Sequence, residues 1–290
     1  MENNHLYKTL FTEVVLVTKV YLITDFIDWM HWYLNVLKFN HVHVFDNESV
    51  VSIEPICNAY GDRCSYEKIV GWPNQYALYN DYINHRSKAW WCFPIDDDEF
   101  LYIDEAYQHD INYFMFAYSK AHPDYNKICV GWRNMFPAKY IESRTNKHLL
   151  LNSTGWSNTA SNIWQCGNRP VKSILNTTYQ YLHGTYNGVI RTHNPITIGK
   201  DNDAFTLNNE MLSDNLQASP TRGDEPLILY HYQFKSNQEW VYKCIKRRSA
   251  ASTLNWKNHP EKYKQLYDYD DIAIDNRMAE LWQKHAYTEV

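Results

Sequence analysis

The stretch Trp90-Trp91-Cys92-Phe93-Pro94-Ile95-Asp96-Asp97-Asp98-Glu99-Phe100 joins a short apolar run to four consecutive acids. Residues 90–95 have the length and composition of a buried strand, so the acids are expected where that strand reaches the surface. The chain is apolar again over 100–103, which places the acids between two segments of core. Like charges in such a place cost folding energy unless a cation or a hydrogen-bonded partner neutralises them. The stretch therefore predicts a bound divalent metal.

Asp96 and Asp98 are the candidate metal ligands within this run. In extended structure alternate side chains point to the same face, which would put these two carboxylates on one side. Ligation by oxygen favours Mg²⁺ or Mn²⁺ over zinc, and these ions usually keep positions that substrate phosphates fill. A solvated acidic turn without metal is the alternative.

Length and charge limit the class of protein. The 290 residues fit one large α/β domain, and no Pro/Gly/Ser-rich linker divides them. A net charge of −5 provides no overall basic field, so nucleic acid is not an expected partner. The six cysteines lack C-x-x-C spacing, so reduced thiols are expected.

The sequence predicts a soluble, cytoplasmic protein without a transmembrane segment. The apolar stretch 14–23 is interrupted by Lys19 and is shorter than the ~20 residues that a membrane span requires. It also lacks a basic lead-in and a small-residue cleavage site. Aromatic residues make up 16% of the chain, which suits either stacking on sugar rings or a tyrosine-rich core.

Hydrophobic periodicity predicts alternating strands and helices. The expected strands are 13–18, 41–45, 65–70, 90–95 and 127–132, and the expected helices are 25–39, 50–60, 74–88 and 107–120. Asp25 is expected to cap the first helix, and the capping box Ser236-Asn237-Gln238-Glu239 is expected to open a late one running to about residue 248. Repeated β-α-β units imply a mainly parallel sheet with helices on both faces. Its ligands would bind beyond the carboxyl ends of the strands, near Lys19, Asp46 and the acidic run.

Four motifs occur in a definite order over most of the chain, from about residue 15 to 248. They are Asp28-Trp29-Met30-His31-Trp32-Tyr33 followed by His41-Val42-His43-Val44-Phe45-Asp46-Asn47-Glu48-Ser49; Gln75-Tyr76-Ala77-Leu78-Tyr79-Asn80-Asp81; Ile95-Asp96-Asp97-Asp98-Glu99-Phe100; and His231-Tyr232-Gln233-Phe234-Lys235-Ser236-Asn237-Gln238-Glu239-Trp240. Together they resemble the motifs of nucleotide-sugar-dependent GT-A glycosyltransferases, in particular glycosyltransferase family 92 and the related family-2-like group. Their joint order is more specific than any one motif. One departure is Lys19-Val20-Tyr21, where the family has Lys-Asn-Glu.

The resemblance implies a GT-A fold, a Rossmann-like α/β architecture of nucleotide-diphospho-sugar transferases. A single catalytic domain would cover 1–250, with the nucleotide-sugar half at about 13–103 and the acceptor half at about 104–235. Residues 251–290 would form a C-terminal helical appendage. The implied activity is that of a metal-dependent hexosyl- or pentosyltransferase, which moves a sugar from a UDP-sugar to a glycan or polysaccharide with inversion.

Candidate site residues combine these motifs with the expected chemistry. The metal ligands would be Asp96, Asp98 and His231, with Mn²⁺ or Mg²⁺ stabilising the departing diphosphate. The donor-binding set would be Lys19, Asp46, Gln75, Asn80, Asp81, Asp96, Asp97 and Lys235. The catalytic candidates are Asp98, Glu99 and Glu142, and spacing does not rank Glu99 and Glu142 against Asp201 and Asp203 as the general base. The acceptor or phosphate side would include Trp132, Trp156, Arg169, Lys172 and His183.

Each assignment has a purely structural alternative. Asn and Asp commonly serve as helix caps and turn residues, tryptophans commonly fill cores, and scattered charges are commonly solvated. For the whole chain, the alternative is a non-catalytic carbohydrate-binding protein on a degenerate transferase scaffold. A hydrolase ranks last, because it needs two acids flanking the sugar rather than adjacent acids.

Overall fold

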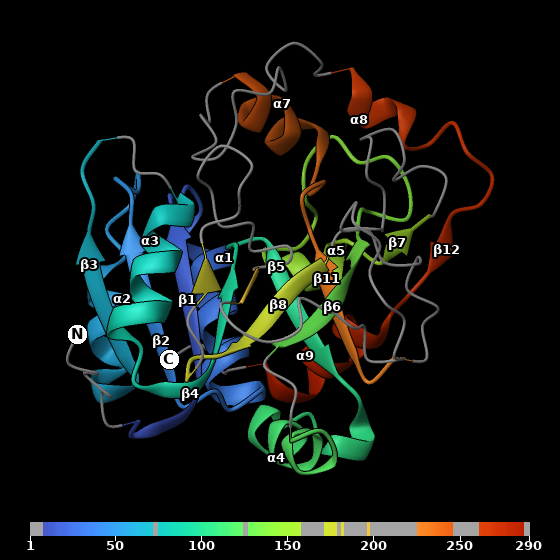
Figure 1. Cartoon of the computed structure of the whole chain (residues 1–290). Helices are drawn as coiled ribbons and strands as arrows, with labels where there is room; N and C mark the ends of the chain where they lie inside the picture. Colours follow the sequence, from blue (N-terminus) through green and yellow to red (C-terminus); the bar gives the residue numbers. More distant parts are fainter. Residues whose placement is uncertain are drawn as a thin grey trace.

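The computed structural model describes residues 8–71, 75–123, 127–157, 171–178, 181–182, 196–197, 225–245 and 261–286. In these residues the chain forms an eight-stranded mixed sheet, two small two-stranded sheets and helices packed around the large sheet (Figure 1). This is the α/β class predicted from the sequence.

The first four strands and the helices between them form the predicted β-α-β units. They are β1 (Leu10–Thr18), α1 (Ile23–His31), β2 (His41–Asp46), α2 (Glu54–Ala59), β3 (Cys64–Lys68), α3 (Gln75–Asp81) and β4 (Ala89–Ile95). Trp32–Val36 continues α1 and Tyr82–Arg86 continues α3 as single π-helical turns, while Gly61–Arg63 is a 3₁₀ turn. Every strand and helix predicted for this half is present, with bounds shifted by a few residues.

The predicted cap of the first helix is wrong. Helix α1 begins at Ile23, and its N-cap, Leu22, makes no side-chain cap hydrogen bond. Asp25 lies inside the first turn, where its carboxylate pairs with Lys235 and with Arg144. Both partners are more than a hundred residues away in the chain, so the sequence around the helix start could not predict these ion pairs.

The remaining elements complete the sheet and cover its ends. They are β5 (Glu99–Ile103), α4 (Ile111–Ala121), β6 (Lys127–Asn134), α5 (Leu149–Asn152), β7 (Gly155–Trp156), β8 (Val171–Asn176), β9 (Tyr181–Leu182), β10 (Ile196–Thr197), β11 (Leu227–His231), α7 (Asn237–Ile245), α8 (Lys262–Gln265), β12 (Ala273–Ile274) and α9 (Arg277–His285). Helix α4 starts later than predicted because Gln108 and His109 adopt left-handed backbone angles, after which Asp110 caps the helix by accepting from the backbone N–H groups of Asn112 and Tyr113. The capping box at 236–239 is confirmed as the start of α7, with Ser236 Oγ donating to Glu239 Oε2 (2.7 Å).

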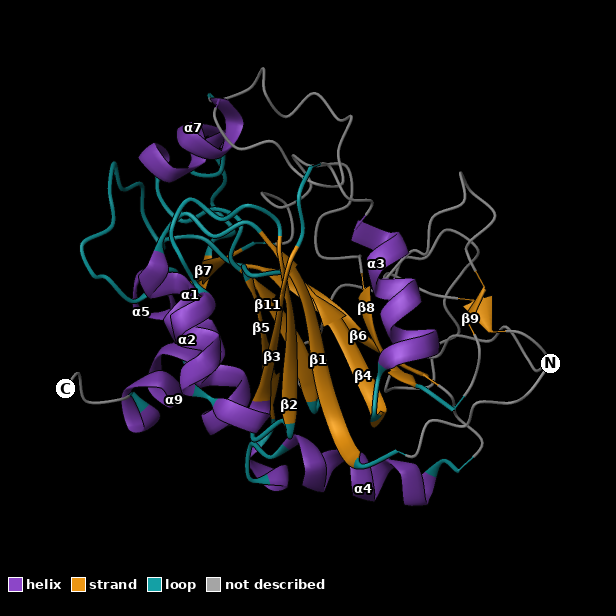
Figure 2. Cartoon of the chain, turned by 90° about the vertical axis from the view of Figure 1, so that its left-hand side faces the viewer, coloured by secondary structure: helices purple, strands orange, loops and turns teal. Residues whose placement is uncertain are grey.

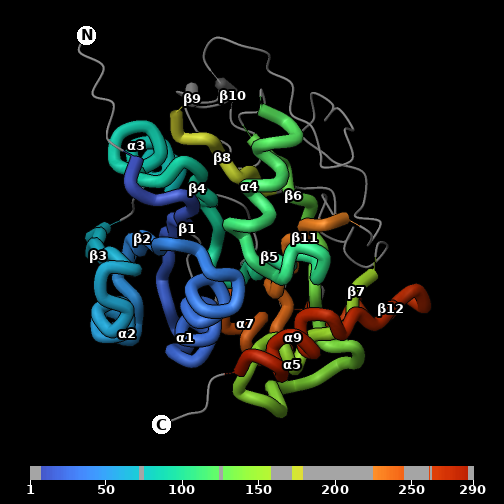
Figure 3. Tube along the Cα trace, turned by 90° about the horizontal axis from the view of Figure 1, so that it is seen from below, coloured from blue at the N-terminus to red at the C-terminus, as the bar shows by residue number. Residues whose placement is uncertain are grey.

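The large sheet has the strand order β3-β2-β1-β4-β8-β6-β11-β5. The pairs β1–β2, β2–β3, β1–β4 and β6–β11 are parallel. The pairs β4–β8, β6–β8 and β5–β11 are antiparallel, so the sheet is mixed and mainly parallel. Helices α1 and α2 lie on one face of the β1–β4 part and α3 lies on the other (Figures 2 and 3).

Strand β1 alternates between two cores, as expected for a strand covered on both faces. Val14 and Leu16 belong to the larger cluster, which α1 shares, whereas Val15 and Val17 belong to the smaller cluster beneath α3. These side chains are almost entirely buried. Burying one such aliphatic side chain contributes about 1.5–3 kcal/mol, so β1 is a major element of the fold.

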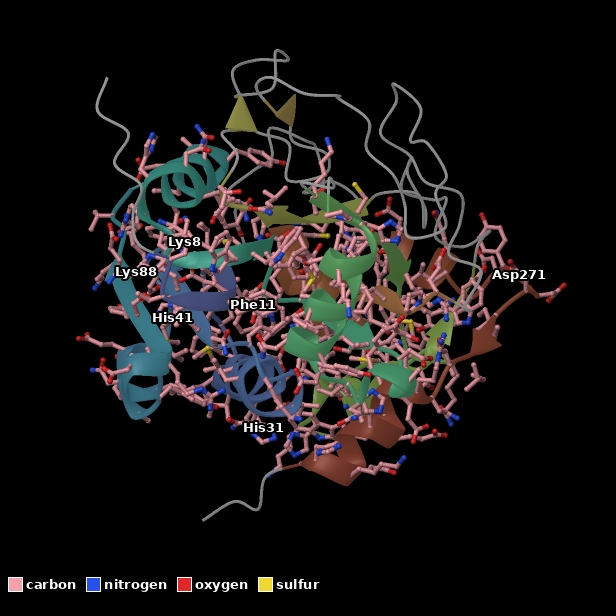
Figure 4. All side chains as sticks on the ribbon, turned by 60° about the horizontal axis from the view of Figure 1, so that its bottom comes forward. Lys8, Phe11, His31, His41, Lys88 and Asp271 are labelled. Carbon is pink, nitrogen blue, oxygen red and sulfur yellow. The ribbon has the colours of Figure 1, made fainter. Side chains whose placement is uncertain are left out.

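The C-terminal helix α9 packs into the larger core. The rings of Trp282 and Trp32 stack with centroids 6.4 Å apart, and both side chains are buried. His31, labelled in Figure 4, has its Nε2 2.7 Å from the backbone oxygen of His285. Helices α8 and α9 lie within 251–290, and the assignment of this segment as an appendage to a domain ending at residue 250 stays a prediction. Within the described parts of the chain, every helix is too short or too polar to span a bilayer.

Candidate functional site

The acidic run lies at the carboxyl edge of the parallel strands. Strand β1 ends at Thr18, β2 at Asp46 and β4 at Ile95, and because these strands are parallel their ends meet at one edge. The acidic residues follow β4 there and lead into β5. This location was predicted, and it is where open α/β sheets bind their ligands.

The conformation of the run differs from the prediction. Asp96–Asp98 is not extended but forms a tight turn, closed by a hydrogen bond from the Glu99 backbone N–H to the Asp96 carbonyl oxygen (3.2 Å). The period-two geometry expected for Asp96 and Asp98 is therefore wrong. The turn connects β4 to β5, which lies four positions away in the strand order of the sheet.

Asp96 has a permanent lysine partner. Lys172 Nζ lies 3.0 Å from Asp96 Oδ2, and Gln75 Nε2 donates to Asp96 Oδ1 (2.7 Å). Burial acts to raise the pKa of Asp96, but the Lys172 ammonium and its hydrogen bond outweigh burial and hold the pKa below its ordinary value. The Lys172 side chain is only 2% exposed, and its ammonium is also 3.4 Å from Glu99 Oε2. Lys172 was expected on the acceptor or phosphate side, but in this structure its ammonium is enclosed by carboxylates.

Glu99 supports the turn from inside the protein. Its side chain is fully buried, and Oε2 accepts a hydrogen bond from the backbone N–H of Asp96 (2.9 Å). Among the described residues, the buried Glu99 Oε1 has no hydrogen-bond partner. Burial raises the pKa of Glu99 to about 8, even though the neighbouring Lys172 lowers it. A buried carboxyl group of this kind holds the turn in place, and the general-base role of Glu99 stays a prediction.

Asp98 and His231 face each other. Asp98 Oδ1 lies 3.5 Å from His231 Nε2, and both side chains are buried. The sheet brings them together because β11 lies between β5 and β6, which aligns His231 with Glu99 on one side and with Asn134 on the other. The Tyr232 backbone N–H also donates to the Asp98 carbonyl oxygen (2.7 Å).

Asn134 fixes the orientation of the His231 ring. Its Oδ1 accepts a hydrogen bond from Gln233 Nε2 (3.2 Å) and lies 3.0 Å from His231 Nδ1. Since this oxygen is an acceptor, Nδ1 donates a hydrogen bond to it, and Nε2 is left facing the Asp98 carboxylate. Trp132 packs against the same ring, with centroids 4.4 Å apart.

This pair fits a shared cation. Two neighbouring ligands of an octahedral Mg²⁺, each about 2.1 Å from the ion, lie about 3.0 Å apart, which is somewhat less than the 3.5 Å Asp98–His231 separation. A histidine whose second ring nitrogen is fixed by a hydrogen bond is also typical of metal ligands. Among the described residues no group of three or more His, Cys, Asp or Glu side chains is placed to hold a metal. Two protein ligands plus substrate phosphates are nevertheless a common arrangement for these ions.

Lys243 is a second lysine at the turn, and the sequence did not identify it. It lies in the last turn of α7, and its Nζ is 3.0 Å from Asp98 Oδ2. Its side chain is 31% exposed, unlike the enclosed Lys172. The capping box that predicted α7 places the helix in sequence but gives no information on which strand end it crosses.

The other donor-side candidates are spread along the same edge. Thr18 Oγ1 donates to Asp97 Oδ2 (2.6 Å), which ties the turn to the end of β1. Asp46 accepts from Tyr66 OH (2.8 Å) and from the backbone N–H of Ser49 (2.8 Å), so its carboxylate is held in a fixed orientation. Tyr66 is a further residue that sequence reasoning missed.

Lys19, Asn80 and Asp81 are less closely tied to the turn. Lys19 follows β1 and is partly exposed. Asn80 is buried and accepts from Asn84 Nδ2 (2.6 Å), a bond within its own helix. Asp81 is exposed and pairs with His85 and Arg86, which places it on the outer surface of α3. The donor-binding roles of all three stay predictions.

Lys235 belongs to a four-residue charge network rather than standing free. It pairs with Asp25, which Arg144 also contacts at 2.8 Å. Arg144 in turn lies 3.0 Å from Glu239 Oε1. Burial acts to lower the pKa of Lys235, but the carboxylates of Asp25, Glu239, Asp97 and Asp98 together raise it. Lys235 therefore remains charged close to the acidic turn.

The remaining candidates lie elsewhere or outside the described residues. Glu142 is exposed and accepts from Tyr140 OH (2.5 Å) and from Asn237 Nδ2 (3.0 Å), near the start of α7. Trp156 stacks on the buried Arg133 guanidinium, 4.5 Å from its ring centroid, which supports the core interpretation. The candidates outside the described residues are Arg169, His183, Asp201 and Asp203.

No protein-family model and no curated protein sequence matches this chain. Among solved structures, the chain is similar to S. aureus TarS 1–349 in complex with UDP, with 11% identity and a TM-score of 0.34 over 95% of this chain and 72% of that one. It is also similar to CMP:2-keto-3-deoxy-manno-octonic acid synthetase in complex with CTP, with 11% identity and a TM-score of 0.29 over 44% of this chain and 54% of that one. Similarity at TM-scores this far below 0.5 assigns no role to this chain.

Proposed function

We propose that this chain is a metal-dependent glycosyltransferase that moves a sugar from a nucleotide diphosphate sugar, with UDP as the nucleotide, to a glycan or polysaccharide acceptor. The observation that carries the proposal is the Asp98–His231 pair at the carboxyl edge of the sheet, 3.5 Å apart and with His231 oriented by Asn134. The sequence motifs that resemble GT-A transferases of the family 92 group support the same assignment, and they imply inversion at the sugar carbon.

In this proposal Asp98 and His231 hold Mn²⁺ or Mg²⁺, and Asp96 is the third candidate ligand. The ion would supply positive charge to the leaving diphosphate. Gln75 and Lys172 keep the Asp96 carboxylate in place, and Asp46 faces the nucleoside with both oxygens oriented by Tyr66 and the Ser49 backbone. Glu99 and Glu142 remain the candidate bases within the described residues.

A non-catalytic carbohydrate-binding protein is the second candidate. Asp96 and Asp98 each have a lysine counter-ion, so the acidic turn is already neutralised in part without metal. Such compensation would also be found in a transferase scaffold that had lost its donor site. The two candidates differ in whether a nucleotide binds only in the presence of metal.

A thermal-shift titration separates them. UDP, GDP and CMP are added with and without Mn²⁺ to the wild type, to Asp98→Ala, and to Asp62→Ala, a matched control on an exposed turn away from the site. A ligand at 100 times its dissociation constant stabilises the folded state by about 2.7 kcal/mol, which raises the melting temperature by several degrees. We expect UDP to do so only with Mn²⁺, in the wild type and the control but not in Asp98→Ala.

A transfer or donor-hydrolysis assay would then show a loss of about 10²–10³-fold for Asp98→Ala. Asp98→Asn, which keeps the shape of the side chain, guards against misfolding of the alanine variant. If no nucleotide shifts the melting temperature of the wild type with metal present, the transferase proposal is wrong and the carbohydrate-binding candidate replaces it.

A further inference from the structure

The two lysines at the acidic turn differ in their freedom to move. Lys172 is 2% exposed, comes from the sheet strand β8 and contacts both Asp96 and Glu99. Lys243 is 31% exposed, comes from the end of α7 and contacts Asp98. A lysine head group on a long flexible stem can change partners at low cost when water can reach it, whereas an enclosed one cannot.

The helix that carries Lys243 is itself anchored. Trp240 of α7 is buried in a cluster with Phe136 and Phe234, and the Tyr242 ring packs edge-on against Tyr21 with centroids 5.2 Å apart. The capping box closes the first turn of the helix. The Lys243 side chain can therefore move without any displacement of α7.

Asp98 cannot bind a metal ion and keep its close ion pair with Lys243 at the same time. Its Oδ2 faces the Lys243 ammonium, while its Oδ1 faces His231 Nε2, where the proposed ion would lie. A divalent cation on Asp98 would repel an ammonium 3.0 Å from the same carboxylate. In the part of the chain that the structure describes, Asp98 is the one carboxylate within ion-pair distance of the Lys243 ammonium.

We infer that Lys243 is an exchangeable counter-ion. It neutralises Asp98 when the donor site is empty, leaves Asp98 when metal binds, and then pairs with the diphosphate of the nucleotide sugar. This inference rests on the proposed function and identifies a phosphate-binding residue that the motifs do not contain. Lys172, in contrast, remains on Asp96 and Glu99 throughout and keeps the turn in shape.

The test measures binding of metal and of nucleotide separately. Mn²⁺ affinity is obtained from electron paramagnetic resonance of the free ion, and UDP affinity from calorimetry at saturating Mn²⁺. The proteins are the wild type, Lys243→Met, Lys243→Arg, and Lys120→Met as a control on α4, which lies at the opposite end of the molecule from α7 (Figure 1). A melting curve for each variant confirms that it is folded.

We expect Lys243→Met to bind Mn²⁺ about threefold to tenfold more tightly, because the competing ammonium is gone. The same variant should bind UDP about tenfold more weakly in the presence of Mn²⁺, because a charge-assisted contact to phosphate is lost. Lys243→Arg should restore most of the UDP affinity, and Lys120→Met should change neither value. Opposite shifts in the two affinities would not arise from a merely structural ion pair.

Three outcomes would overturn the inference. If Lys243→Met leaves Mn²⁺ affinity unchanged or weakens it while the wild type binds Mn²⁺ and UDP, Lys243 is a structural partner of Asp98 and the proposed function is untouched. If Lys243→Met binds Mn²⁺ more tightly but its UDP affinity is unchanged, the inferred ion pair between Lys243 and the diphosphate is wrong. If the wild type binds neither Mn²⁺ nor UDP, the proposed function fails together with the inference.

Discussion

Two polar clusters lie at opposite ends of the same parallel strands, and they are a buried cluster around one acid, Glu13, and the partly exposed acidic turn at 96–99. At the amino end, Glu13 of β1 is hydrogen-bonded to Tyr82 OH (2.6 Å) and Ser87 Oγ (2.7 Å) and lies 2.7 Å from His41 Nδ1. Figure 4 shows His41, Lys8 and Lys88 at this edge of the sheet. At the carboxyl end, the acidic turn has four acids, two lysines and a buried Glu99 oxygen without a hydrogen bond to any described residue.

The difference shows how a structural polar cluster can be told from a candidate site. Each carboxylate oxygen of Glu13 has a hydrogen-bond partner of fixed geometry. The cluster therefore contributes stability, and its carboxylate needs no bound ligand. The acidic turn has more negative charge than its fixed lysine can neutralise, and its second lysine is partly exposed. A bound cation can neutralise negative charge that remains at a place accessible to solvent.

The largest expected effect on stability comes from breaking the closed cluster. Glu13→Ala should lower the free energy of unfolding by about 3 kcal/mol, because His41, Tyr82 and Ser87 lose their common acceptor inside the protein. Urea denaturation measures this loss. UDP affinity in the presence of Mn²⁺ should stay at the wild-type value, since the cluster is at the far end of the strands. Glu13→Gln, which retains an acceptor oxygen, should lose less, and a Glu13→Ala variant as stable as the wild type would contradict this interpretation.

His43 should make the amino-end region sensitive to acid. Burial lowers its pKa to about 3, with the charges of Arg86 and His41 adding to the effect, and its ring stacks on Tyr82. The unfolded chain takes up this proton near the ordinary value of 6.5 and the folded protein does not. The stability that the neutral ring provides is therefore present above pH 6.5 and is lost as the pH falls from there toward 3.

His43→Phe isolates this contribution. Urea denaturation of wild type and variant between pH 7.5 and 4 should show the stability of the wild type falling relative to the variant as the pH decreases. The phenyl ring keeps the stack on Tyr82 and the edge-on contact with Phe45 but does not titrate. Parallel curves over the whole range would show that His43 does not titrate as expected.

Glu99 should act in the opposite direction, because burial raises its pKa although Lys172 offsets part of that effect. Burial raises its pKa to about 8, so in the folded protein the carboxyl group keeps a proton that the unfolded chain loses near 4.5. The stability from this proton is fully present below pH 4.5 and is lost as the pH rises through 8. Glu99→Gln mimics the protonated group, so its stability relative to the wild type should increase between pH 5 and 8.5. A constant difference would indicate that Glu99 is ionised at both ends of that range.

The elements predicted from the sequence are those whose patterns lie within a short stretch of neighbouring residues. Each strand and helix of the β1–β4 half was expected, because continuous apolar runs and helical periodicity are properties of neighbouring residues. Strands β5, β8 and β11 were not assigned, and β8 and β11 complete the sheet beside β4 and β6. Their apolar runs are short, and what makes them strands is pairing with partners far away in the sequence.

The candidate site shows the same division. Asp96, Asp98 and His231 were singled out from the sequence, and the structure brings Asp98 and His231 together. Lys243, which contacts Asp98, Asn134, which contacts His231, and Tyr66, which contacts Asp46, were missed, because lone lysines, asparagines and tyrosines occur in many roles. Lys172 was identified but expected to face the acceptor, and only the packing of β8 beside β4 shows that its ammonium is enclosed.

By itself the sequence determined the α/β class, the order of the first strands and helices, and the position of the acidic run at a strand end. These depend on periodicity and on the excess of charge in one place, both of which can be read along the chain. The tertiary structure alone decided that the run is a turn, which lysine is fixed and which is exposed, and that His231 faces Asp98. Those facts depend on strand pairing between distant segments and on burial, because the energy of a charge is set by its neighbours in space.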